Sequence, residues 1–154
     1  MKPTKILFVC LGNICRSPAA EGVMKSLAKG FPIEIQSAGT AGYHIGELPD
    51  IRMRSHSHKR GYELVSRAQQ FDPLIHFEMF DHIIAMDGNN LRDLKSMDQH
   101  KKYQHKLSLM IDYSQIMNVK EVPDPYYGGP AGFEHVLDIL EDACAGLLKK
   151  LKAG

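Results

Sequence analysis

The segment that most constrains the fold is a short apolar run that leads, without a spacer, into a tight turn and a helix start. Lys5 to Cys10 reads KILFVC, the pattern of a strand that is covered on both faces. The next residues, LGNICRSP, place glycine, asparagine, cysteine and arginine in one turn. Ser17 is suited to cap a helix and Pro18 to open it, and this helix is expected to end at Gly30.

Further strands and helices alternate along the 154 residues. Strands are predicted at 33–36, 82–86 and 106–111, helices at 50–61 and 89–97, and a solvated connector at 98–106. Apolar residues at three- and four-residue steps from Phe133 to Leu151 predict a long last helix with one apolar face. This order predicts one α/β domain, residues 1–154, with a four-stranded parallel twisted sheet and helices on both faces. Such sheets bind ligands beyond the carboxyl ends of their strands, where the first turn lies.

Composition excludes several other classes of protein. Lys and Arg (19) nearly balance Asp and Glu (18), so we expect neither nucleic acid nor a membrane surface as a partner. The first apolar run breaks at Gly12 and is too short for a signal peptide or a membrane span. Three cysteines, Cys10, Cys15 and Cys144, are too few for a disulfide framework. We therefore expect a cytoplasmic location.

The first turn has the features of an anion cradle. Five residues separate Cys10 from Arg16, enough for the backbone to curl around a phosphate with its N–H groups pointing inward. The helix start adds positive charge, and Arg16 can bind two phosphate oxygens. A thiol at Cys10 in such a field is expected to be a thiolate. The predicted phosphate-binding residues are Leu11, Gly12, Asn13, Ile14, Cys15 and Arg16.

Other interpretations of this turn remain to be weighed. A nucleotide-binding P-loop would end in Gly-Lys-Ser/Thr, which is absent here. Cys10 and Cys15 could bind zinc, but no second Cys/His pair has matching spacing, so no metal is expected. Cys10 could also be an ordinary buried cysteine beside an unrelated arginine. Ser17 could cap the helix or donate a hydrogen bond to the Cys10 sulfur.

The segment CLGNICRSP resembles the Cys-x5-Arg-Ser phosphate loop of the low-molecular-weight protein tyrosine phosphatases. The resemblance covers nearly the whole chain and includes SAGT at 37–40, AMD at 85–87 and DPYYG at 124–128. It implies a cysteine-dependent, metal-independent hydrolase of phosphotyrosine that needs no cofactor and forms a phosphocysteine intermediate.

The resemblance also implies the catalytic roles. Cys10 would be the nucleophile, Arg16 would bind the phosphate, and Asp124 would act as general acid and then as base. Taken alone, VPDPYYGG reads as an Asp-Pro turn beside aromatic residues. Pro125 restricts the backbone of Asp124 and so directs its carboxyl group.

Further residues are placed around the loop by motif match. Asn13, Ser17 and Ser37 would support its shape, and His76 is a candidate to brace Asn13. Cys15 matches a thiol that forms a reversible disulfide with the nucleophile in relatives. The predicted pocket rim consists of Leu11, Ile14, Tyr43, His44, Tyr126 and Tyr127, although these tyrosines and His44 could be ordinary surface residues.

Tyrosine-phosphorylated proteins are therefore the expected partners, inorganic phosphate the product, and a monomer or weak dimer the expected state. Phosphoarginine relatives carry small threonines where this chain has Leu11 and Ile14, so a protein arginine phosphatase is the alternative. A non-catalytic phosphotyrosine-binding module is the other alternative, disfavoured because nucleophile and acid are both present. Related arsenate reductases use two further cysteines in mid-chain, which are absent here.

Overall fold

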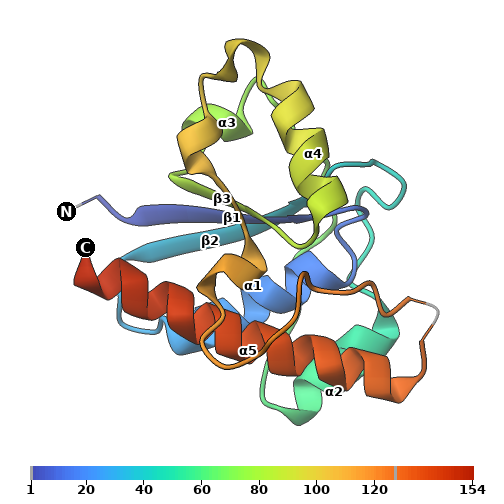
Figure 1. The fold of residues 1–154 in the computed structure, drawn as a ribbon. Coiled ribbons are helices and arrows are strands. Elements are labelled where there is room, and N and C mark those ends of the chain that lie inside the picture. The colour runs from blue at the N-terminus through green and yellow to red at the C-terminus, as the bar shows by residue number, and fades with distance from the viewer. Residues whose placement is uncertain (1, 127) are drawn as a thin grey trace.

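In the computed structural model, which describes residues 2–126 and 128–154, four parallel strands form one sheet in the order β2-β1-β3-β4 (Figure 1). The strands are β1 (Thr4–Cys10), β2 (Ile33–Gly39), β3 (His82–Ala85) and β4 (Leu107–Leu109). Each neighbouring pair is parallel. The predicted α/β class, with four parallel strands, is confirmed.

Helices cover both faces of this sheet (Figure 1). Ile6 and Phe8 of β1 pack with α1 (Arg16–Leu27) and α5 (Pro130–Ala153). Leu7 and Val9 point to the opposite face, where α3 (His76–Met79) and α4 (Gly88–Met97) lie. The remaining helices are α2 (Ile51–Lys59), which packs against α5, and the 3-10 turns η1 (Gln99–Lys101), η2 (Gln104–Lys106) and η3 (Met110–Tyr113).

The register of the sheet brings the first turn to its carboxyl edge. Cys10, the last residue of β1, pairs with Gly39, the last residue of β2. A Cβ atom at Gly39 would lie 2.7 Å from the carbonyl oxygen of Leu11, so only glycine lets β2 approach the turn this closely. The backbone N–H groups of Thr40 and Ala41 then donate to the carbonyl oxygens of Cys10 and Leu11. The floor of the turn is therefore bonded to the strand beside it.

One local prediction is wrong, and another is incomplete. Helix α1 begins at Arg16, one residue before Ser17, and Cys15 is in the cap position without a side-chain capping bond. The segment 98–106 is mostly exposed, as predicted, but it is not an open connector, because it forms two 3-10 turns around the buried side chain of Asp98. Asp98 accepts hydrogen bonds from the backbone of Lys102 and Tyr103, and the Tyr103 ring stacks on Phe77.

Gly146→Ala should destabilise the fold, because a Cβ there would lie 1.9 Å from the carbonyl oxygen of Tyr113 in η3. Separating α5 from η3 should lower the free energy of unfolding by about 1–3 kcal/mol. Gly132→Ala in the same helix is the control, since its nearest neighbour would be 3.5 Å away. Alanine should raise helix stability there by up to about 1 kcal/mol. Urea unfolding measures both, and equal effects would contradict this account.

Candidate active site

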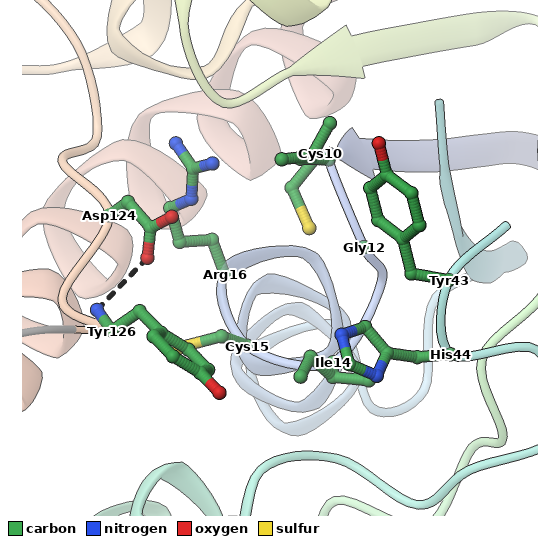
Figure 2. A pocket seen from close by; sticks show the side chains of 10 residues that line it. Cys10, Gly12, Ile14, Cys15, Arg16, Tyr43, His44, Asp124 and Tyr126 are labelled. Atoms are coloured by element: carbon green, nitrogen blue, oxygen red, sulfur yellow. Dashed lines mark hydrogen bonds between the residues drawn. The ribbon is translucent and has the colours of Figure 1, made fainter. Parts of the chain in front are cut away.

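One pocket, of about 220 Å³, lies at the carboxyl end of β1 (Figure 2). It brings together the phosphate loop (residues 10–16), the loop after β2, and the segment before α5. Cys10, Arg16 and Asp124 all line it, as the sequence predicted. The other lining residues are Leu11, Gly12, Ile14, Cys15, Tyr43, His44 and Tyr126. Tyr127 lies outside the described residues.

Asn13 holds the shape of the phosphate loop. Its backbone is in the left-handed region, with φ of 56°, and its side chain is 3% exposed. The Asn13 Oδ1 accepts from the backbone N–H of Gln69 at 2.9 Å. Its Nδ2 donates to the hydroxyl oxygens of Ser17 at 2.8 Å and Ser37 at 2.9 Å. Because asparagine tolerates the left-handed region and carries both an acceptor and two donor hydrogens, it suits this position.

The backbone N–H of Gln69 thus braces Asn13, and the candidate His76 forms hydrogen bonds elsewhere. His76 is buried, and its Nδ1 accepts from the backbone N–H of Asp72 at 2.8 Å. Its ring packs against Phe71 and Phe80. Burial lowers the pKa of His76, which favours the neutral ring that this acceptor role requires. The donor is a backbone N–H group, which every residue except proline carries, so the sequence could not single out Gln69.

These bonds also fix the direction of the hydrogen bond at the Cys10 sulfur. An N–H can only donate, so Gln69 fixes the Asn13 amide with both Nδ2 hydrogens toward Ser17 and Ser37. The Ser17 hydroxyl accepts one of them and keeps its own hydrogen. Its nearest acceptor is Cys10 Sγ at 3.0 Å, since the Ala38 carbonyl is at 3.5 Å. Ser17 therefore donates to the sulfur, an arrangement that stabilises a thiolate.

Ser37 connects this network to a buried carboxylate. Its hydroxyl donates to Glu21 Oε1 at 2.6 Å, and Glu21 Oε2 is paired with Lys25 at 2.6 Å. Glu21 is 5% exposed, and no role was predicted for it from the sequence. The sequence signal for Glu21 was its position one helical turn after Ser17 in α1.

The two cysteines of the loop have different surroundings. Cys10 and Cys15 are both buried, at 3% and 7% exposed. Burial raises the pKa of the Cys15 thiol well above its usual range, and a negative charge on Cys10 raises it further. Cys15 therefore stays a neutral thiol beside the candidate nucleophile.

Arg16 is held by an acid that sequence reasoning did not assign. Its Nη1 donates to Asp87 Oδ2 at 2.6 Å and to the carbonyl oxygen of Val122 at 3.0 Å. Asp87 Oδ1 also accepts from the backbone N–H of Asn90 and caps α4. The available signal was an aspartate two residues after β3, the strand that pairs with β1, at the start of a helix.

Asp124 lies at the edge of the pocket beside Arg16 (Figure 2). Its Oδ1 accepts from the backbone N–H of Tyr126 at 2.9 Å, an Asx turn that holds the carboxyl group near the pocket. Arg52 of α2 supports this turn, because its Nη1 donates to the Tyr126 carbonyl oxygen at 2.9 Å. The Arg52 guanidinium also lies 5.1 Å from the centre of the Tyr126 ring.

The rim of the pocket includes residues of the phosphate loop and of the loop after β2. Leu11 is 44% exposed, and Tyr43 is 76% exposed on the loop after β2. His44 lies directly over the loop, since a Cβ at Gly12 would be 3.0 Å from its ring.

Within residues 2–126 and 128–154, no group of three or more His, Cys, Asp or Glu side chains could hold a metal ion. No helix in the same part of the chain is long and apolar enough to cross a membrane.

The family model for low molecular weight phosphotyrosine protein phosphatases matches residues 5–154. The chain belongs to this family. A relative from Synechocystis is 52% identical over 96% of both chains. The human low molecular weight phosphotyrosine protein phosphatase is 39% identical over 94% of each chain. A crystal structure of a protein tyrosine phosphatase from Entamoeba histolytica superposes with a TM-score of 0.94 at 45% identity, covering 98% of both chains.

Asp87→Asn should lower kcat/KM on an aryl phosphate by about tenfold to a hundredfold, because Arg16 loses its charged anchor. The amide can still cap α4 through its oxygen, but it then turns an N–H donor toward the Arg16 donor. Unfolding free energy should fall by about 1–3 kcal/mol. Asp93→Asn, on the exposed side of α4, is the matched control. Equal kinetics for the two variants would remove Asp87 from this role.

Proposed function

We propose that the protein hydrolyses phosphotyrosine in proteins, and small aryl phosphates, through a phosphocysteine intermediate. The observation that carries this proposal is the convergence of Cys10, Arg16 and Asp124 in one pocket with partly apolar walls. A nucleophile, a phosphate-binding cation and a carboxyl group are the three parts that the reaction requires. Membership of the phosphotyrosine phosphatase family agrees with it.

In the first step, the Cys10 thiolate attacks phosphorus as the bond from phosphorus to the phenolic oxygen breaks. Arg16 and the backbone N–H groups of residues 11–16 bind the three equatorial oxygens and stabilise their charge. The leaving phenolate has a conjugate pKa near ~10, so it needs a proton in the transition state. Asp124 supplies that proton and becomes a carboxylate.

In the second step, water attacks the phosphocysteine. The Asp124 carboxylate removes a proton from this water, and the bond from sulfur to phosphorus breaks. Inorganic phosphate leaves and the Cys10 thiolate is restored, with Ser17 donating to the sulfur in both steps. The two steps together consume one water, and Asp124 ends protonated as it began.

The pocket walls favour an aromatic substrate. Leu11 and Ile14 line the pocket from the loop. Tyr43 and Tyr126 lie on either side of it (Figure 2). Apolar and aromatic side chains gain contact with a phenyl ring, whereas Leu11 and Ile14 offer no hydrogen-bond acceptor to the guanidinium of phosphoarginine. We infer tyrosine-phosphorylated proteins as partners. The cysteines are free thiols, which agrees with the proposed cytoplasmic location. We also propose that the protein is a monomer or a weak dimer.

The function is tested by measuring kcat/KM on a phosphotyrosine peptide and a matched phosphoarginine peptide, with a chelator present. Wild type should prefer phosphotyrosine by about tenfold or more, and Cys10→Ser should turn over neither. Preference for phosphoarginine would reject the proposed substrate. Turnover by Cys10→Ser would reject the nucleophile.

Asp124→Asn should lower kcat on phosphotyrosine by about a hundredfold or more, as expected for loss of a general acid. The loss should shrink when the leaving phenol is more acidic, because such a leaving group needs less protonation. A series of aryl phosphates with substituted phenols measures this slope. Glu121→Gln, a nearby carboxylate outside the pocket, is the control and should leave the slope unchanged. The same loss with every phenol would argue against proton donation.

We propose further that Cys15 protects Cys10 from over-oxidation. Peroxide converts Cys10 to a sulfenic acid, and attack by the Cys15 sulfur then forms a disulfide and releases water. Cys15→Ser should retain activity but recover several-fold less of it when thiol is added after peroxide. Recovery equal to that of wild type would contradict this role.

A further inference from the structure

A second hollow begins beside the proposed active site, between α2 and the chain that follows it. This α2 groove has a volume of about 490 Å³, and its lining includes Leu48, Ile51, Arg54, Lys59, Leu64 and Val65. A volume of this size lies in the range of sites that hold ligand groups. It shares no lining residue with the pocket around Cys10.

The groove exposes aliphatic side chains that the fold does not use. Ile51 is 71% exposed at the first position of α2, and Val65 is 72% exposed across the groove. Leu48 is 39% exposed at its near end. Single exposed aliphatic residues are common, but three that line one hollow give it an apolar part, which is typical of a contact site.

Hydrogen bonds join the near end of the groove to the active-site rim. The backbone N–H of Glu47 donates to the carbonyl oxygen of His44, closing a turn that leads directly to Leu48. The N–H of Asp50, the cap of α2, donates to the carbonyl oxygen of Ile14 in the phosphate loop at 2.6 Å. The groove therefore has a fixed position relative to the pocket.

The distance from the active-site rim to the groove suits a residue close to a phosphotyrosine in the substrate. A turn places its first and last residues, here His44 and Glu47, within about 7 Å of each other, and Leu48 is about 3.8 Å further along the chain. An extended peptide advances about 3.3 Å per residue. A side chain roughly three to five positions from a phosphotyrosine bound at Cys10 would reach the groove.

The charges favour the same occupant. Arg54 and Lys59 line the groove, and the carboxylate of Glu63 is bonded to His58. Because the phosphate itself is bound at Cys10, acidic residues on either side of the phosphotyrosine would supply the charge that complements this cationic edge. A second copy of this chain would bring no such excess of negative charge, because its net charge is +1.

We propose that the α2 groove binds the polypeptide next to the phosphotyrosine of a protein substrate, with one aliphatic side chain between Ile51 and Val65. This proposal rests on the proposed function of the pocket. It makes the groove a determinant of which phosphotyrosine sites are cleaved.

The test is a leucine scan in a phosphotyrosine peptide of serine and glycine, with one leucine moved up to about five residues to either side. With wild type, leucine at one position should raise kcat/KM about five- to twentyfold over serine, the gain expected for burying an aliphatic side chain. Ile51→Ser and Val65→Ser should each remove most of that gain. Leu74→Ser, 91% exposed and outside both hollows, is the control and should keep it.

para-Nitrophenyl phosphate separates the two proposals, because it is too short to reach the groove. A flat leucine scan with normal turnover of this compound would overturn the groove proposal and leave the proposed function standing. A concentration-dependent dimer that Ile51→Ser dissociates, together with a flat scan, would assign the groove to a second copy instead. Turnover of neither peptide nor aryl phosphate would overturn both proposals.

Discussion

The side chain of Asn13 is the constraint on which the rest of the site depends. A loop that points successive N–H groups inward cannot satisfy its own backbone, and its left-handed residue needs support from outside. Asn13 receives that support from Gln69 and passes it to Ser17 and Ser37. One buried amide thus connects β2, α1 and the chain after α2. It also decides which way the Ser17 hydroxyl points, and so whether the Cys10 sulfur receives a hydrogen bond.

The parallel sheet makes this arrangement possible. Because β1 and β3 are neighbours, their carboxyl ends bring Cys10 and Asp87 to the same edge, although they are far apart in sequence. Arg16 can then reach from α1 to the start of α4. The segment before α5 crosses the same edge, where the Val122 N–H donates to the Met86 carbonyl oxygen and Asp124 follows shortly after. The groups of the proposed mechanism therefore meet at one edge of the sheet.

Much of this could be predicted from sequence because its signals are local. KILFVC, the Gly12–Asn13 bend and the stripe of α5 each specify one element, and alternation of such elements specifies a parallel sheet. The family motifs then placed Cys10, Arg16 and Asp124 in one site.

The start of α1 was predicted one residue too late because Ser17 has the residue type of a helix cap, whereas its hydroxyl donates to the Cys10 sulfur. The turns of the connector 98–106 were missed because its polar composition hides the buried Asp98 and the partly buried Tyr103. Gln69 contacts Asn13 through its backbone N–H, and Asp87 pairs with Arg16, which is far away in sequence. The sequence pattern alone shows neither contact.

The anchoring of Arg16 has a consequence for the thermodynamics of binding. A free arginine side chain loses about 2 kcal/mol of rotamer entropy when it is immobilised. Here Asp87 and Val122 already immobilise the guanidinium, so most of that loss accompanies folding rather than association with a ligand. The same contacts share its positive charge, which limits how tightly a free phosphate dianion is retained. A rigid but partly neutralised cation therefore favours rapid turnover over strong inhibition by product.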